Sequence, residues 1–207
     1  MYKSSYFKAD NQADVLEFMR QNSFVTLVGF DGIFPVATQV PVKVVVTDES
    51  IKLVGHIMTK TDHCKAFKLH PNVMAIFTGA HAYISASVYE KPESASTWNY
   101  KTVQAKGVIR LLGADETYSI IRDITNHYEK TESPAAFHKM DDAYIQKHLS
   151  AIMGFEITVG HLDHVFKLSQ NHSDHNQDSI IQNLQKSNDP LAHEVARDMI
   201  KSKKTKA

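Results

Sequence analysis

Alternating apolar and polar residues run through most of the chain and predict β-strands, since a period of two gives a strand two different faces. The segments SFVTLVGF, FPVATQVPVKVVV and IKLVGHIM are separated by turn-forming residues at Asp31-Gly32 and at 48–50. This order predicts successive antiparallel strands in a meander. Further strands are expected at residues 73–79, 82–88 and 98–112, and at 154–161 and 163–171 around a tight turn at Leu162-Asp163.

Apolar residues at helical spacing predict helices between these strands. The expected ranges are 12–20, 63–70 (ending before Pro71), 115–130, 141–153, 178–186 and 190–201. Strands in mostly hairpin order with inserted helices predict an α+β fold built on a closed or nearly closed antiparallel barrel. We expect one domain over residues 1–207, with C-terminal helices at about 174–203 and a basic tail.

Composition narrows the classes of function. Lys plus Arg and Asp plus Glu both number 23, so no overall field attracts nucleic acid or an anionic membrane, and direct DNA contact needs a local patch. The single cysteine, Cys64, cannot form an internal disulfide, and no apolar run has the length of a spanning helix. A cytoplasmic protein is expected.

The twelve histidines include the pairs His161/His164 and His172/His175, but without further ligands at a settled spacing they predict no metal site.

The stretch HAYISASVY has strongly different odd and even positions. The odd positions are polar or aromatic and the even positions are small or apolar; the odd set is His81, Tyr83, Ser85, Ser87 and Tyr89. We expect the even face to pack inside a barrel or against a helix. The odd face is suited to a flat, polar ligand.

Three other segments carry groups that bind ligands in many proteins. Thr59, Lys60 and Thr61 precede a predicted helix and form a candidate anion site, although Thr61 or Asp62 could simply cap that helix. Trp98 and Asn99 could flank an aromatic heterocycle or only anchor the start of a strand. Lys167, Ser169 and Asn171 would share one strand face, and could donate to a cofactor's carbonyls and ring nitrogens or form a plain exposed face.

Four segments resemble, in order and spacing, the PaiB-type FMN-binding negative transcriptional regulators. They are GHIMTKTDH, TGAHAYISASVY, STWNYKTVQAKGVIRLL, and AIMGFEI followed by FKLSQN, and the similarity covers about residues 2–185. That family is similar to the flavin-binding split-barrel proteins, which include pyridoxamine phosphate oxidases and HugZ-like haem-degrading proteins. The resemblance implies an FMN-binding split β-barrel of antiparallel, Greek-key type with peripheral helices. It also implies a homodimer with FMN at the subunit interface.

The resemblance implies a set of cofactor-binding positions: His56, Thr59, Lys60, Thr61, His63, His81, Tyr83, Ser85, Trp98, Asn99, Lys167, Ser169 and Asn171. The chain departs from the family pattern at several places. Ala80 and Ala86 replace prolines, Val88 replaces a tryptophan, and Thr59 stands where a basic residue is common. Lys60 and His63 are left to supply positive charge to the phosphate. We expect these differences to affect the affinity for FMN.

Three functions remain open at this point. The first is a flavin-dependent transcriptional regulator, the second a flavin oxidoreductase that passes electrons from NAD(P)H through FMN to a small acceptor, and the third a HugZ-like haem-handling protein. The sequence contains no G-x-S-x-G nucleophile elbow, so no catalytic residue is assigned.

Overall fold

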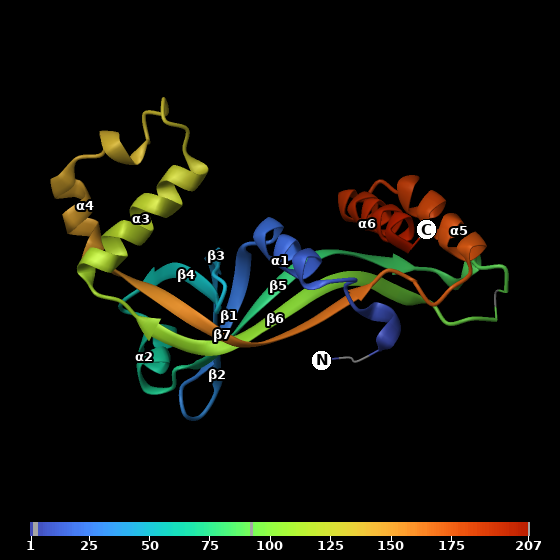
Figure 1. The fold of residues 1–207 in the computed structure, drawn as a ribbon, viewed down its shortest axis with the longest axis horizontal. Helices are drawn as coiled ribbons and strands as arrows, with labels where there is room; N and C mark the ends of the chain where they lie inside the picture. Colours follow the sequence, from blue (N-terminus) through green and yellow to red (C-terminus); the bar gives the residue numbers. More distant parts are fainter. Residues whose placement is uncertain (2–3, 92, 207) are drawn as a thin grey trace. The chain divides into compact units, whose positions relative to one another are not determined.

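The computed structural model describes residues 1, 4–91 and 93–206, and its central feature is a seven-stranded antiparallel sheet (Figure 1). The strand order is β2-β1-β5-β6-β7-β4-β3. The strands are β1 (Phe24–Phe30), β2 (Pro35–Pro41), β3 (Lys43–Val46), β4 (Ile51–Met58), β5 (Asn72–Ile84), β6 (Thr97–Leu111) and β7 (Ile152–Lys167). The α-helices of the described residues are α1 (Gln12–Gln21), α2 (Asp62–Leu69), α3 (Ala114–Tyr128), α4 (Asp142–Leu149), α5 (Asp174–Gln185) and α6 (Pro190–Lys206).

The chain forms two compact units, and strands β5, β6 and β7 contribute residues to both. The barrel unit consists of Met19–Phe77 and Gln104–Leu162. The helix-capped unit consists of Met1–Phe18, Thr78–Val103 and Asp163–Ala207, and it contains α5 and α6.

In the barrel unit, the segment expected as one strand over 34–46 divides into two strands. β2 pairs with β1, with Phe24 opposite Pro41, whereas β3 pairs with β4, with Lys43 opposite Val54. The break lies at Val42, which is buried and donates its backbone N–H to the Ser23 carbonyl at 2.8 Å. β2 and β3 therefore lie at opposite ends of the sheet order, and β2 also contacts β4, so the sheet curls toward closure. The predicted simple meander is wrong here, because one bent segment serves both edges.

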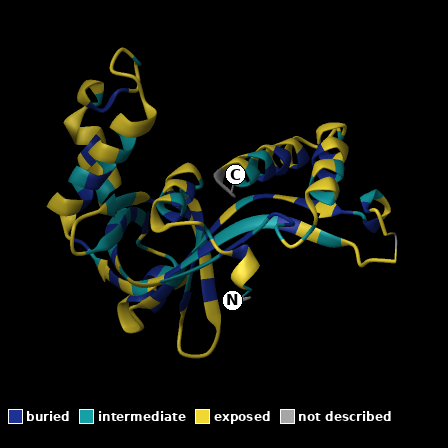
Figure 2. Ribbon diagram, turned by 45° about the vertical axis from the view of Figure 1, so that its right-hand side comes forward, coloured by how far each residue is buried: buried dark blue, intermediate teal, exposed yellow. Residues whose placement is uncertain are grey.

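In the helix-capped unit, small apolar residues of β5 pack against α5 and α6. Ala80, Ala82 and Ile84 belong to one buried cluster with residues of both helices, including Ile180 and Val195. Buried and exposed positions alternate along the strands, as Figure 2 shows. The even face of the 81–89 stretch thus packs against helices, which was one of its two expected places.

Two of the expected strand boundaries are wrong. β7 is continuous through Leu162 and Asp163. A tight hairpin turn requires positive φ at its central positions, which leucine does not favour, and no glycine follows to relieve it. The strand expected at 82–88 instead ends at Ile84, and a 3-10 helix follows at Ala86–Val88. The Ser85 side chain begins that helix by accepting a hydrogen bond from the Ser87 N–H at 3.2 Å.

The helices agree well with the apolar periodicity. α2 ends at Leu69, before Pro71, and α5 and α6 occupy the expected C-terminal region. α4 is shorter than expected, because Ile152 and Met153 pair with β4 as the first residues of β7. None of the helices in the described part of the chain combines the length and the apolar character that a membrane crossing requires.

Candidate functional site

Three aromatic side chains that the sequence predicted as site residues lie together on the helix-capped unit. The Trp98 ring on β6 is 5.7 Å from that of Tyr83 and 6.0 Å from that of His81, both on β5. Tyr83 is 54% exposed and Trp98 52% exposed, while their strand neighbours Ala82 and Asn99 are buried. We call His81, Tyr83 and Trp98 the aromatic surface. Exposed aromatic rings gathered in this way are typical of a surface that meets a ligand or another protein.

Asn99 and Ser169 were also predicted to contact the cofactor, but the structure places both in the core of the helix-capped unit. The Asn99 amide donates to Ser169 Oγ at 3.0 Å, and the Ser169 hydroxyl lies 3.1 Å from Asn99 Oδ1. The same amide is 3.5 Å from the Met199 sulfur of α6. Asn99 follows Trp98 on β6 and so points to the opposite face. The polar atoms of Asn99 are therefore hydrogen-bonded to Ser169 and Met199 inside the core.

The expected row of Lys167, Ser169 and Asn171 on one strand face is wrong. β7 ends at Lys167, and Ser169 has a φ of 63°, which breaks the alternation. Ser169 is buried and Asn171 is exposed. The cause is a local turn in which Gln170 accepts from the Leu168 N–H at 2.7 Å and donates to the Phe166 carbonyl at 2.5 Å.

Lys167 lies in a partly buried group of ionisable and aromatic side chains. Its ammonium donates to the Thr97 hydroxyl and is 5.8 Å from the centre of the Phe7 ring. Burial lowers the pKa of Lys167, and burial together with the Lys167 charge lowers the pKa of His172. His172 stacks on Tyr89 at 4.7 Å, and burial raises the pKa of the Tyr89 phenol, whose hydroxyl has no hydrogen-bond partner among the described residues. The sequence did not predict this stack, since the two residues are far apart along the chain.

In the barrel unit, the turn between β4 and α2 and the first turn of α2 carry four more predicted residues. Thr61 is the N-cap of α2: its hydroxyl accepts from the Cys64 N–H at 3.3 Å and donates to the Met58 carbonyl at 2.8 Å. Thr59 donates to the Ala151 carbonyl at 3.1 Å, and His63 lies 3.2 Å from the Asp62 carboxylate. The capping alternative for Thr61 is therefore confirmed. The His63 N–H of α2 donates to the Asp62 carboxylate at 2.7 Å. What the turn offers an anion is therefore the exposed Lys60 ammonium, which has no acidic partner among the described residues.

His56 is a fifth predicted residue in the barrel unit, on β4 opposite Gly154 of β7. Its Nδ1 is buried without a hydrogen-bond partner among the described residues. Burial lowers the pKa of His56, so the neutral imidazole is favoured in the folded protein. A buried ring nitrogen of this kind is suited to a ligand or a water molecule.

The predicted residues thus form two groups, and the assignment of each to a cofactor stays a prediction. The barrel unit holds His56, Thr59, Lys60, Thr61 and His63, and the helix-capped unit holds the other positions. The Ser85 hydroxyl already forms hydrogen bonds in the turn after β5: it accepts from the Ser87 N–H, and it lies 2.8 Å from the Ser87 hydroxyl. No group of three or more His, Cys, Asp or Glu side chains suited to a metal ion occurs within the residues that the structure describes.

Comparison with known sequences places the chain among flavin-related proteins. The profile of the family described as "Putative FMN-binding domain" matches residues 1–161. The chain is also 32% identical over 200 residues to the "Protease synthase and sporulation protein PAI 2" of Bacillus subtilis (strain 168), covering 96% of each chain. The resemblance to the PaiB-type proteins that the four motifs predicted is confirmed, and FMN is the cofactor that the matching family names.

Comparison with solved structures confirms the fold. An FAD- and haem-binding protein from Mycobacterium smegmatis aligns with a TM-score of 0.59 at 14% identity, covering 77% of this chain and 72% of that one. A flavocytochrome from Azotobacter vinelandii aligns with a TM-score of 0.62 at 10% identity, covering 81% of this chain and 72% of that one. The chain is an α+β protein with the flavin-binding split-barrel fold.

Proposed function

The chain belongs to the family described as "Putative FMN-binding domain", and from this premise we propose that it is a PaiB-type FMN-binding protein that works as a homodimer and represses transcription. The aromatic surface is the observation that carries the proposal. It presents an indole, a phenol and an imidazole, all exposed, on strands whose other faces are buried. The regulatory part of the proposal rests on the likeness to the PaiB-type proteins.

The aromatic surface fits the chemistry of an isoalloxazine ring system, which is flat, aromatic and edged with hydrogen-bonding groups. A ring stacked on Trp98 or Tyr83 would remove large exposed aromatic area from water. Such aromatic contacts are worth about 0.5–1.5 kcal/mol beyond the burial of area. His81 adds a ring nitrogen that can donate to or accept from the flavin edge.

The turn before α2 fits the phosphate of FMN. The Thr59 and Thr61 hydroxyls donate to backbone carbonyls, so the exposed Lys60 ammonium is the group of this turn that is left for a phosphate. The proposal therefore assigns Lys60 the main electrostatic contact with the phosphate. The phosphate contact and the ring contact are tested separately below.

A second copy of the chain gives the aromatic surface a further partner. The proposed homodimer would cover exposed rings that a monomer leaves in water, and it would bury FMN between the copies. Sedimentation velocity with and without FMN tests this part. A chain that remains monomeric at every FMN concentration would contradict the dimer.

The cofactor is tested by titrating the protein with FMN and following the emission of Trp98, the only tryptophan of the chain. A flavin bound on the aromatic surface absorbs where indole emits, so binding should quench the emission strongly. Lys60→Ala should weaken FMN binding about tenfold or more, because one charge-assisted contact is lost. The matched control is Lys68→Ala, since Lys68 is also exposed but lies in the last turn of α2, at the other end of the helix that Lys60 precedes.

Riboflavin separates the two contacts because it has the ring system without the phosphate. Its affinity should be the same for the Lys60→Ala and Lys68→Ala proteins. Equal FMN affinity in those two variants would remove Lys60 from the site. FMN binding without any change in Trp98 emission would remove the aromatic surface from it.

Regulation and catalysis are distinguished by two further measurements. A salt-dependent mobility shift with the DNA upstream of the protein's own gene would support repression through DNA contact. Steady NADH or NADPH oxidation that depends on added FMN and exceeds the rate of free flavin would favour the oxidoreductase instead.

A further inference from the structure

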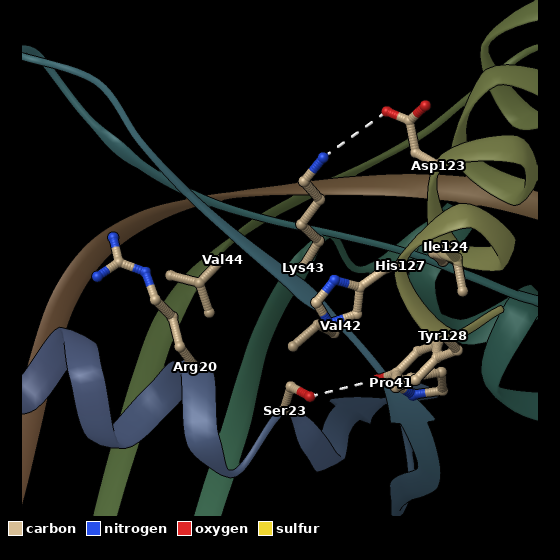
Figure 3. A pocket seen from close by; sticks show the side chains of 10 residues that line it. All are labelled: Arg20, Ser23, Pro41, Val42, Lys43, Val44, Asp123, Ile124, His127 and Tyr128. Atoms are coloured by element: carbon tan, nitrogen blue, oxygen red, sulfur yellow. Dashed lines mark hydrogen bonds and ion pairs between the residues drawn. The ribbon is translucent and has the colours of Figure 1, made fainter. Parts of the chain in front are cut away.

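A pocket in the barrel unit contains none of the residues assigned to FMN. It lies where the end of α1, the bend between β2 and β3, and the second half of α3 meet, and its volume is about 240 Å³ (Figure 3). This is somewhat smaller than the sites that hold drug-sized ligands. The lining residues are Arg20, Ser23, Pro41, Val42, Lys43, Val44, Asp123, Ile124, His127 and Tyr128.

Apolar side chains provide one part of the lining. Val42 is buried, and the hydrogen bond of its N–H to the Ser23 carbonyl fixes the bend in the chain at this point. Pro41 and Val44 flank it on β2 and β3, and Ile124 of α3 contributes from the other side. A ligand must bring carbon atoms to cover these groups favourably.

Cationic side chains provide the second part. Arg20, in the last turn of α1, has no acidic partner among the described residues, and the Lys43 ammonium forms an ion pair with Asp123 at 3.7 Å. Asp123 is shared, because Arg122 donates to the same carboxylate at 3.1 and 3.3 Å. The Asp123 carboxylate is therefore shared by two cations, Lys43 and Arg122, and Arg20 adds a third positive charge, so positive charge is in excess around the pocket.

The other polar side chains of the lining, Ser23, His127 and Tyr128, form only weak contacts with each other. The Ser23 and Tyr128 hydroxyls are 3.5 Å apart, at the outer limit of a hydrogen bond, and Figure 3 shows them joined by a dashed line. The His127 ring packs edge to face against Tyr128 at 4.9 Å. These groups can turn toward a ligand oxygen at little cost.

We propose that this pocket binds a small organic carboxylate with an apolar body, as a second ligand of the protein. The Arg20 guanidinium and the Lys43 ammonium receive the carboxylate, and the carbon skeleton lies on Val42, Val44 and Ile124. A guanidinium matches the two oxygens of a carboxylate in one plane. A bare inorganic anion would satisfy the charges but leave the apolar lining uncovered, so a carbon body is part of the assignment.

Calorimetric titration of the full chain with benzoate tests the proposal, with benzamide as the neutral analogue of the same shape and inorganic phosphate as the bare anion. Benzoate should bind, and benzamide and phosphate should each bind at least about tenfold more weakly. Arg20→Ala and Lys43→Ala should each weaken benzoate binding about tenfold. The matched control is Lys147→Ala, an exposed lysine of α4 outside the pocket, which should bind benzoate like the unchanged protein.

Two further measurements keep the result interpretable. Ile124→Phe fills the apolar side of the pocket without removing a charge, and it should abolish benzoate binding. The FMN affinity of every variant should equal that of the unchanged protein, which would show that the variant chains are folded. Equal affinity for benzoate and benzamide would overturn the proposal. It would also be overturned by unchanged benzoate binding in the Arg20→Ala and Lys43→Ala proteins, or by phosphate binding as tightly as benzoate.

Discussion

Asn99 and Ser169, which lie 70 positions apart in the chain, hold each other in the core of the helix-capped unit. Asn99 is fully buried and donates its amide to the Ser169 hydroxyl at 3.0 Å, while that hydroxyl lies 3.1 Å from the Asn99 carbonyl oxygen. The pair joins the start of β6 to the turn after β7. Both residues had been expected to face a cofactor, but in the structure they form a buried hydrogen-bonded pair.

Removing the Ser169 side chain should therefore lower the free energy of unfolding, and the size of the loss should depend on whether the new residue tolerates the backbone conformation at position 169. Ser169→Ala and Ser169→Gly both remove the hydroxyl that donates to the buried Asn99 carbonyl oxygen and accepts from its amide, at a cost of about 1–3 kcal/mol in the free energy of unfolding. Because Ser169 has a φ of 63°, glycine should be the milder change by about 1 kcal/mol. Urea denaturation of the two variants measures the difference. Equal losses, or a larger loss for glycine, would show that the backbone at this position is not strained.

Lys101 forms a second, partly buried connection in the same unit. Its ammonium is 3.0 Å from Asp198 on α6 and lies over the rings of Phe18 and Phe166, at 5.0 and 4.8 Å from their centres. Asp198→Asn should destabilise by about 1–3 kcal/mol, because it leaves a mostly buried cation without its counter-charge. Lys101→Met keeps the aliphatic packing and should cost less. In the double variant the loss caused by Asp198→Asn should shrink, and a strictly additive double variant would contradict the pairing.

Gly107 and Gly160 form a matched pair for testing the packing of the barrel unit. A Cβ at Gly107 would lie 2.2 Å from the Thr158 carbonyl oxygen, whereas a Cβ at Gly160 would have no atom within 4 Å. Gly107→Ala should therefore lower the free energy of unfolding by at least about 2 kcal/mol, since backbone atoms must move. Gly160→Ala should be neutral or slightly stabilising. Thermal unfolding of the two variants compares them directly, and similar melting temperatures would show that the strands near Gly107 are not packed this closely.

Three histidines make stability depend on pH. Burial lowers the pKa values of His56, His164 and His172, and nearby Lys8 and Lys167 lower those of His164 and His172 further. The unfolded chain, with histidine pKa values of about 6.5, then binds protons more readily than the folded chain. The contribution of these neutral histidines to the free energy of unfolding is therefore complete above a pH of about 6.5. It should be lost as the pH falls below that value, because the unfolded chain then takes up protons that the folded chain does not.

Urea midpoints measured at several pH values between 7.5 and 5.5 check this dependence. The midpoint should decrease toward the acid end, and His56→Gln should make the decrease smaller because one titrating group is removed. A midpoint that rises as the pH falls would mean that the folded state holds these protons more tightly than the unfolded state.

The candidate site was predictable only to the extent that it depends on local pattern. The alternation of residues 81–84 correctly indicated that His81 and Tyr83 share an exposed face, and Trp98 joins them. The pattern failed at Ser85 and at Ser169, because side-chain hydrogen bonds to the backbone turn the chain at both places. The pocket between α1, β3 and α3 has no signal in the sequence, since its cations come from Arg20 and Lys43 on separate elements.

The sequence by itself determined the antiparallel α+β class, most helix positions, the family and the cofactor that the family names, because periodicity and short motifs are properties of neighbouring residues. Only the tertiary structure decided that residues 34–46 bend at Val42 to serve both edges of the sheet, and that β7 passes unbroken through Leu162-Asp163. The same is true of the burial of Asn99 against Ser169. These outcomes depend on hydrogen-bond partners and packing surfaces that come from distant parts of the chain, and no local pattern of residues contains that information.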